Sequence, residues 1–246
     1  MGTFIPNISV DCVIFGFSNK CLNILLTKRE LRDEESNKIL LTDYTVQGHH
    51  VLQGENVNDA AIRVLKDKTG LEDIFLEQFY TFGNTNRLVK EHDQLWLRKK
   101  FPMVSDHVVS IGFCALVDGS KILPDMQHPE TTWIPISELS KLELGFDHKE
   151  VILKALDFLR QKIRLEPIIF ELLPEKFTIS QMQQLYETIF GITLDRRNFK
   201  KKIGLLEYII PLKEKQHGVP HKPATVYIFS QEVYNLTKKE KLDLIF

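Results

Sequence analysis

Runs of apolar residues divide the first half of the chain into strands and one clear helix. The β-rich runs cover 10–17, 22–26, 75–83 and 108–117. The triplet Ser18-Asn19-Lys20 separates the first two runs and predicts a hairpin. In 56–68, apolar residues recur at i, i+3, i+4, i+7 and i+8, which predicts a helix with one buried face. Gly70 follows, where a glycine commonly ends a helix.

Two polar stretches interrupt this pattern, and both are predicted to be loops. The first, 29–37, is charged and is expected on the surface. The second, 84–106, is polar and basic and carries Leu95-Trp96-Leu97, which looks exposed. Connections of that length are typically functional or mobile.

A long amphipathic helix is predicted over 147–164. Asp147 and Glu150 have the spacing of a capping box, and Pro167 stops the pattern. We place a domain boundary at the end of this helix, which predicts one domain over 1–165 and a second over 166–246.

The second domain contains the pattern of a helix-turn-helix. Thr178 and Gln181 have capping-box spacing at the start of a short helix that Gly191 ends. Asp195 is placed to cap another helix, whose apolar stripe repeats at i, i+4 and i+7 through Phe199, Ile203 and Leu206. Two short helices joined by a tight turn are typical of this DNA-binding motif.

The second of these helices and the segment after it are basic. Between Arg196 and Lys222 there are 8 Lys and Arg residues but only 2 acidic ones. Strand-like runs at 208–212 and 224–229 flank the basic loop, as in the wing of a winged helix. Basic residues at a wing tip neutralise phosphates, and residues of the recognition helix, here Arg197, Asn198 and Lys201, read base edges. The candidate DNA-binding residues are Arg196, Arg197, Asn198, Lys200, Lys201, Lys202, Lys213, Lys215, His217 and Lys222. A solvated basic helix in an ordinary α+β domain is the alternative.

Composition narrows the class of protein. The chain has 246 residues, 43% hydrophobic and 26% charged, as in globular proteins, and its net charge of −1 identifies no partner. No apolar run reaches the ~18 residues of a membrane span, and the first residues lack the features of a secretory signal. We therefore expect a cytoplasmic protein without a membrane partner. Cys12, Cys21 and Cys114 suit neither a disulfide framework nor a zinc site, so free thiols, no metal and no cofactor are expected.

The most specific motif of the first domain lies at 48–71, which reads GHHVLQGENVNDAAIRVLKDKTGL. This segment resembles the Nudix box, G-x5-E-x7-R-E-U-x-E-E-x-G-U, where U is aliphatic. The positions that match are Glu55, Arg63, Leu65, Gly70 and Leu71. The positions that depart from the box are His49, Val64, Asp67 and Lys68, in place of the first glycine and three helix glutamates.

These departures fall on the residues that carry the family's chemistry. In the family the helix glutamates hold divalent cations, which bridge a diphosphate and activate water. Positions 64, 67 and 68 share one helical face, and here they sum to zero formal charge. A lysine ammonium ~5 Å from a divalent ion would be repelled by roughly 6–7 kcal/mol at an effective dielectric constant of 20. Only Glu55 and Asp67 remain as ligands, so catalysis of the family type is not expected.

The resemblance extends beyond the box. The segment 133–139 looks like the final strand of a Nudix domain, and 145–148 looks like the start of its last helix. With the winged helix that follows, the chain resembles Nudix-related transcriptional regulators, similar to the sugar-responsive, arabinose-regulator-like branch. The resemblance implies an α+β protein, with a Nudix-type α/β/α sandwich and mixed sheet followed by a winged helix-turn-helix. It also implies a homodimer that binds double-stranded DNA at a pseudo-palindromic operator.

In this interpretation the Nudix cleft binds a small-molecule effector, a sugar or an ADP-ribose-like nucleotide, without cleaving it. The candidate effector-binding residues are Arg29, His49, His50, Glu55, Arg63, Asp67, Lys68 and Arg87. Several have plainer alternatives: Arg63 could form a structural salt bridge with Glu55 or Asp67, and the two histidines could be exposed on a loop. His148 is expected to be structural, with a role in the site as the alternative. Trp96 is expected to contact the effector or the partner subunit, or simply to pack on the surface.

Two other functions stay open from the sequence. One is a Nudix hydrolase with an unusual metal site built from Glu55 and Asp67. The other is a protein-binding adaptor whose winged helix contacts another protein and has no affinity for DNA.

Overall fold

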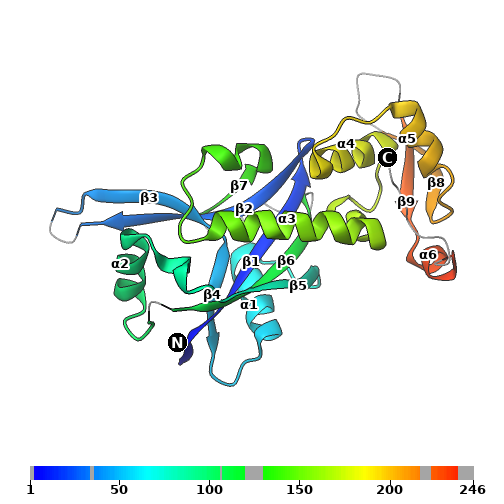
Figure 1. The fold of residues 1–246 in the computed structure, drawn as a ribbon. Coiled ribbons are helices and arrows are strands. Elements are labelled where there is room, and N and C mark those ends of the chain that lie inside the picture. Colours follow the sequence, from blue (N-terminus) through cyan, green and yellow to red (C-terminus); the bar gives the residue numbers. More distant parts are fainter. Residues whose placement is uncertain (1–2, 34–35, 106, 120–129, 217–222, 238–246) are drawn as a thin grey trace.

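The computed structural model describes residues 3–33, 36–105, 107–119, 130–216 and 223–237. It contains a mixed β-sheet with helices on both faces, followed by a small helical domain with a two-stranded hairpin (Figure 1). This is the α+β architecture, a sandwich followed by a winged helix, that the sequence predicts. Within the described ranges, none of the helices combines the length and apolar character needed to span a bilayer.

The sheet is built around one parallel pair of strands. Its strand order is β3-β2-β1-β6-β5, with β4 paired to β1 and β7 paired to β2. The β1–β6 pair is parallel and the other pairs are antiparallel. The strands are β1 Phe4–Ser18, β2 Cys21–Arg32, β3 Ile39–Thr45, β4 Gln47–Leu52, β5 Phe75–Phe82, β6 Val109–Asp118 and β7 Thr131–Pro135.

Successive residues of β1 point to opposite faces of the sheet, so each face has its own core. Val10, Cys12 and Ile14 pack with helix α1, Val57–Thr69, on one face. Val13 and Phe15 pack with helix α3, His148–Leu165, on the other. The alternation follows from the two-residue repeat of a strand, and it makes β1 the central strand of the sandwich.

Local signals in the sequence fix the ends of α1. The Asn56 side chain accepts a hydrogen bond from the Asp59 backbone amide, and Gly70 has φ of 69°. That conformation costs a residue with a Cβ atom about 1–2 kcal/mol, which is why glycine stands there. Short 3-10 helices η1, Thr85–Leu88, and η4, Ile136–Lys141, connect other elements.

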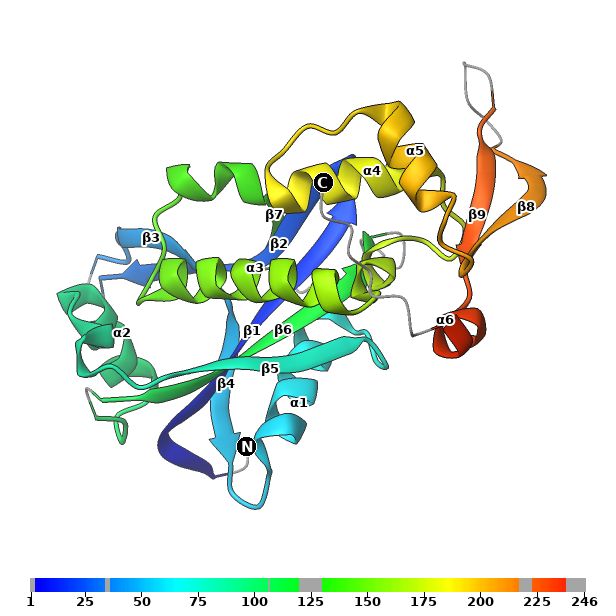
Figure 2. The ribbon, with the colours of Figure 1, turned by 45° about the vertical axis from the view of Figure 1, so that its right-hand side comes forward.

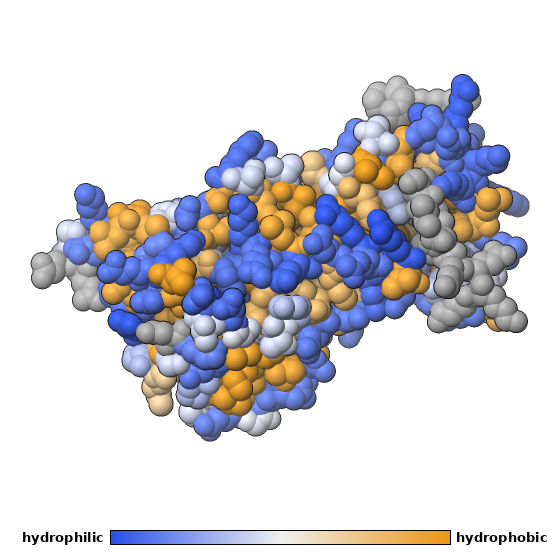
Figure 3. All heavy atoms as spheres, in the orientation of Figure 1, coloured by the Kyte–Doolittle hydropathy of each residue, from blue (hydrophilic) through white to orange (hydrophobic). Residues whose placement is uncertain are grey.

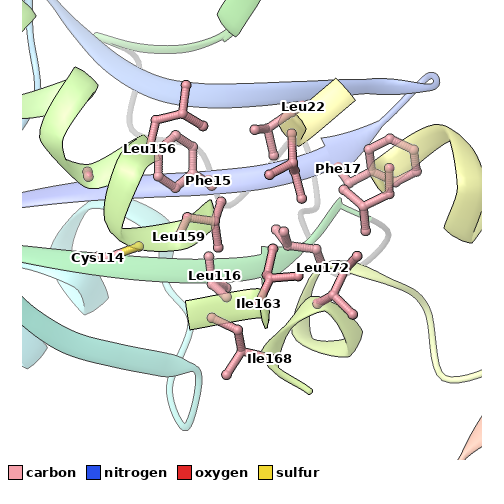
Figure 4. Close-up of a cluster of buried hydrophobic side chains, with 14 of the residues drawn as sticks. Phe15, Phe17, Leu22, Cys114, Leu116, Leu156, Leu159, Ile163, Ile168 and Leu172 are labelled. Carbon is pink, nitrogen blue, oxygen red and sulfur yellow. The ribbon is translucent and has the colours of Figure 1, made fainter. Parts of the chain in front are cut away.

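The winged helix follows α3 and shares a core with the sheet. Its elements are η5 Ile168–Leu172, α4 Ile179–Phe190, α5 Arg196–Ile203, β8 Ile209–Lys215, β9 Thr225–Phe229 and α6 Gln231–Thr237. Helix α4 contacts β2, and η5 contacts β1 and β6. In Figure 4, Phe17 and Leu22 of the β1–β2 hairpin lie in one apolar cluster with Leu172 of η5 and Ile163 of α3. One buried cluster therefore runs from the sheet into the small domain.

Three sequence-based predictions about local structure are wrong. Arg29–Arg32 belong to β2, so the first four residues of the predicted loop 29–37 are strand. The stretch 84–106 is not a long loop, because it folds into η1 and the helix α2, Glu91–Lys100. Asp147 has φ of −94° and ψ of 18° and makes no side-chain capping bond, because its carboxylate is paired with Arg87.

Candidate functional site

A pocket lies where α2 faces strands β1, β2 and β4. Its volume is about 430 Å³, within the range of ~300–1,000 Å³ of small-molecule sites. The candidate effector residues that line it are Arg29, His49, His50, Lys68 and Arg87. Glu55, Arg63 and Asp67, although described, lie outside the lining. The lining also contains Trp96 and His148, for which the sequence left a role in the site open, and four residues that it did not assign to an effector: Asp11, Lys100, Phe101 and Phe146.

A buried cation holds one wall of the pocket together. Arg29 Nε donates to Asp43 Oδ1 at 2.7 Å, and its Nη2 donates to both Asp43 and Asp93. Both carboxylates are 0% exposed. Burial opposes the charge of Arg29, but hydrogen bonds to the two aspartates outweigh burial and raise the pKa of the guanidinium. This pairing ties α2 to the sheet.

Gly145 and Phe146, just before α3, pack closely against the Arg29 guanidinium. The Arg29 Cζ atom lies 4.5 Å from the centre of the Phe146 ring and 5.2 Å from that of Trp96. Phe146 has φ of 54°, a conformation rare for a bulky residue, and its amide donates to Asp93 Oδ2 at 2.8 Å. A Cβ atom at Gly145 would lie 2.6 Å from Arg29 Nη2, so only glycine fits there.

A second buried guanidinium, that of Arg87, reaches the start of α3. It donates to Asp147 from Nε at 2.5 Å and from Nη2 at 2.8 Å. Its Nη2 atom also lies 3.4 Å from Asp11 Oδ2, which accepts from Ser110 Oγ at 2.5 Å. Arg87 therefore joins η1, β1 and α3 beneath the pocket.

Buried histidines and aromatic rings form another part of the wall. His148 Nδ1 accepts from the Val46 amide at 3.2 Å, so this nitrogen carries no proton. Desolvation lowers the pKa of His148 and of His50. The His50 ring stacks on Phe4 at 4.9 Å between centroids and meets the edge of Phe101 at 4.7 Å. The two histidines of β4 therefore do not lie on an exposed loop.

Glu55 and Arg63 form a bidentate salt bridge at the start of α1. Arg63 donates to Oε1 at 2.7 Å and to Oε2 at 2.9 Å, and Oε2 also accepts from the Leu52 amide at 2.9 Å. The hydrogen bond from Arg63 lowers the pKa of Glu55. The structural pair that the sequence offered as an alternative for Arg63 is thus present.

The basic helix α5 is exposed on its outer side. The Asp195 side chain caps it by accepting from the Asn198 amide at 2.8 Å, while Phe199 and Ile203 are buried. The predicted contacts on its exposed side are Arg196, Arg197, Asn198, Lys200 and Lys201, and Lys202 is half-buried. Hydrophilic residues cover the outer part of α5 and β8 in the view of Figure 3.

The hairpin beside α5 has the predicted order of strands. β8 and β9 pair antiparallel, and Lys213 and Lys215 are exposed on β8. Figure 2 shows this hairpin next to α5 at one end of the molecule. His217 and Lys222, also predicted to contact DNA, lie outside the described residues.

The turn between α4 and α5 is held by Glu187, because its Oε1 atom accepts a hydrogen bond from the Leu194 amide at 2.8 Å.

The two parts of the chain match two protein families. Residues 6–155, more than half of the chain, match the NUDIX domain. The chain belongs to the Nudix family. Residues 169–229 match the NrtR DNA-binding winged helix domain, so the Nudix domain is followed by a winged helix.

Several proteins are similar to this chain over most of its length. A curated relative from Acinetobacter baylyi, the "ADPR responsive transcriptional repressor NtrR", is 26% identical over 239 residues, covering 97% of this chain and 88% of the relative. The crystal structure of Shewanella oneidensis NrtR with a 27mer DNA is 22% identical, with a TM-score of 0.71 over 93% of this chain and 95% of that chain. A MutT/nudix family protein from Enterococcus faecalis is 20% identical, with a TM-score of 0.63 over 92% and 89% of the two chains. The structural likenesses confirm the fold. The matches support an NrtR-like chain, and they give no support to the arabinose-regulator-like branch.

The divalent cation of the Nudix family does not fit the donor set of this box. Val64 is 3% exposed in the core beneath α1, both oxygens of Glu55 are bonded to Arg63, and Lys68 brings a positive charge. Asp67 alone stays available as a carboxylate ligand. Elsewhere in the described part of the chain, Asp43, His92 and Asp93 bring ligand atoms within 4.8 Å of one another. There the guanidinium of Arg29 is already bonded to both carboxylates.

The sequence analysis missed the acidic residues that organise the pocket. Asp11, Asp43, Asp93 and Asp147 come from four distant segments and meet around two arginines. A signal existed for Asp11, which interrupts an otherwise apolar strand. A charge in such a position is expected to have a buried partner, although the pattern does not identify that partner.

Proposed function

We propose that this protein is a DNA-binding transcriptional regulator whose Nudix domain senses a small metabolite without cleaving it. The observation that carries the proposal is the combination of a Nudix domain whose box lacks the three helix glutamates with an NrtR-type winged helix. The exposed basic helix α5 and the basic strand β8 supply the charge that a DNA backbone requires. The name of the Acinetobacter relative, a transcriptional repressor, supports the same function.

For the effector, we propose a nucleoside diphosphate of the ADP-ribose class. The pocket places aromatic rings, Trp96 and Phe101, beside lysines and the buried carboxylate of Asp11. Rings stack on a base, cations bind a diphosphate, and carboxylates accept hydrogen bonds from ribose hydroxyls. The Acinetobacter relative is named for its response to ADPR, which supports this class. A free sugar such as arabinose offers neither a base nor a diphosphate to these groups.

We propose that two copies bind a pseudo-palindromic operator as a homodimer. In a dimer of this kind the recognition helices enter successive major grooves about one helical turn apart. Arg197, Asn198 and Lys201 would contact base edges, and Lys213 and Lys215 would contact phosphates. We place the domain boundary at 165/166, supported by family matches that stop at 155 and resume at 169.

Hydrolysis of the effector is not part of the proposal. The Glu55 carboxylate is engaged by Arg63, so the alternative metal site from Glu55 and Asp67 would first have to break that salt bridge. If the protein were a hydrolase of this kind, ADP-ribose would turn over with Mg²⁺ or Mn²⁺, and Glu55→Gln would abolish that turnover.

The experiment that tests the function is capture of fragmented genomic DNA from the source organism on the purified full chain. A regulator enriches a few promoter fragments that share an inverted repeat, and ADP-ribose, but not arabinose, changes their retention. The double variant Arg197→Ala/Lys201→Ala should lose the enrichment, whereas Lys66→Ala, on the Nudix helix α1, should keep it. If the wild type retains no fragments, with or without ADP-ribose, the result would favour the adaptor.

A further inference from the structure

The positive charges around the pocket are not equally available to a ligand. Arg29 and Arg87 are bonded to buried aspartates, and Lys28 pairs with Glu30 at 2.8 Å. Among the described residues, Lys68 and Lys100 make no ion pair, and both line the pocket. An anion that enters the pocket therefore finds its free counter-charges on these two lysines.

The buried network itself disfavours an anion. It holds four carboxylates, Asp11, Asp43, Asp93 and Asp147, against the guanidiniums of Arg29 and Arg87. Desolvation lowers the pKa of the neighbouring His148, so at neutral pH this histidine adds no positive charge. The network therefore has an excess of formal negative charge, and Asp11 is the one of its four carboxylates that lines the pocket. It suits hydroxyl groups, which donate hydrogen bonds, better than phosphates.

Lys68 carries its positive charge at a position where the Nudix box has a negatively charged residue. It occupies the last turn of α1, at the position where the Nudix box has a glutamate that binds the divalent cation. In the family that cation neutralises the diphosphate of the substrate. Here the chain has an ammonium in place of the carboxylate, and Val64, at the first glutamate position, is buried and apolar.

We propose that the Lys68 ammonium replaces the divalent cation of the Nudix family as the group that binds the ligand's diphosphate. Recognition of a nucleoside diphosphate by this pocket is then independent of metal. The exchange also separates binding from cleavage, because an ammonium holds a diphosphate but activates no water for attack. This inference rests on the proposed function, since it takes the effector to contain a diphosphate.

The test measures binding of ADP-ribose by calorimetry to the full chain, first in EDTA and then in excess Mg²⁺. The wild type should bind with the same affinity in both. Lys68→Gln loses a charge-assisted hydrogen bond to the diphosphate, so it should weaken binding by about 10- to 150-fold. Lys68→Glu should bind still more weakly in EDTA. Lys66→Gln is the matched control, because Lys66 lies in the same helical turn and pairs with Glu72 outside the pocket, and it should bind as the wild type does.

The outcomes separate this inference from the proposed function. If EDTA abolishes tight ADP-ribose binding, or if Lys68→Gln leaves that binding intact, the role of Lys68 is wrong. The proposed function as a regulator is not affected by either result. Inorganic pyrophosphate, titrated in EDTA, tests the diphosphate site without the nucleoside. If pyrophosphate binds through Lys68 while ADP-ribose does not bind, the effector class is wrong and the site remains. If the wild type binds neither compound, both the site and the effector class are wrong.

Discussion

Substituting Arg29 with methionine should destabilise the protein more than any comparable change at its surface. Methionine keeps much of the length of the side chain and its contact with the Phe146 ring but removes the guanidinium. Asp43 and Asp93, both 0% exposed, would then be left as buried carboxylates without their cation. The substitution therefore isolates the charge pairing from the packing.

The magnitude follows from the burial of the three partners. Removing one member of a buried ion pair costs ~3–5 kcal/mol, because the remaining charge is left uncompensated. Two carboxylates depend on Arg29, so we expect a loss of at least ~4 kcal/mol in the free energy of unfolding. For a chain of this length that loss corresponds to a Tm lower by roughly 8–16 °C. Arg32, on the same strand, pairs with Glu30 with 45% of its side chain exposed, and Arg32→Met should cost at most ~1 kcal/mol.

Urea unfolding followed by circular dichroism, with thermal unfolding beside it, measures both variants against the wild type. The reasoning about the buried network is refuted if Arg29→Met loses no more stability than Arg32→Met. Effector binding provides a second readout, because α2 loses its tie to the sheet in Arg29→Met alone.

Four further predictions concern the pH dependence of stability, a helix cap and DNA binding. Burial lowers the pKa of His148 below its ordinary value of 6.5, so the unfolded chain binds this proton first as the pH falls. The contribution of His148 to stability is therefore complete above about pH 6.5 and decreases below it. In urea titrations His148→Asn should flatten that decrease, whereas His107→Asn, at an exposed histidine, should not. Thr178→Val removes the capping box of α4 and should cost ~1 kcal/mol in urea unfolding, and an unchanged midpoint would contradict the cap. Arg197→Ala should weaken specific operator binding by ~1–3 kcal/mol in gel-shift titrations if it reads a guanine. Lys213→Ala should instead lower the slope of log affinity against log salt by about one, and an unchanged slope would remove its phosphate contact.

Local patterns predicted the elements well because the physics that sets them is local. The 3.6-residue repeat and the caps at Asn56, Gly70 and Thr178 lie within a few residues of the helices that they define. The same holds for the turn and basic face of α5. In the winged helix the sequence therefore predicted α4, α5, β8 and β9, although it did not predict η5 or α6.

The pocket was harder to predict because its residues are joined by long-range pairing. Arg29 is separated from Asp93 by 64 positions, and Arg87 from Asp11 by 76, and no periodicity connects such residues. Arg29 looked like part of a charged loop because the buried aspartates that neutralise it are distant in sequence. The helix α2 was missed for a related reason, since Asp93 and Trp96 anchor it through partners outside the segment rather than through an apolar stripe.

The apolar cluster that runs from the sheet into η5 and α4 also bears on how such a protein evolves. A winged helix joined to its sensor by a flexible tether could be exchanged as a module, with any sensor attached to any DNA-binding unit. Here Phe17 and Leu22 are buried in the same cluster as Leu172 and Ile189, so an exchanged sensor would have to bring a matching apolar surface with it. New effector specificity is therefore reached more readily by substitutions in the pocket than by recombination at the junction.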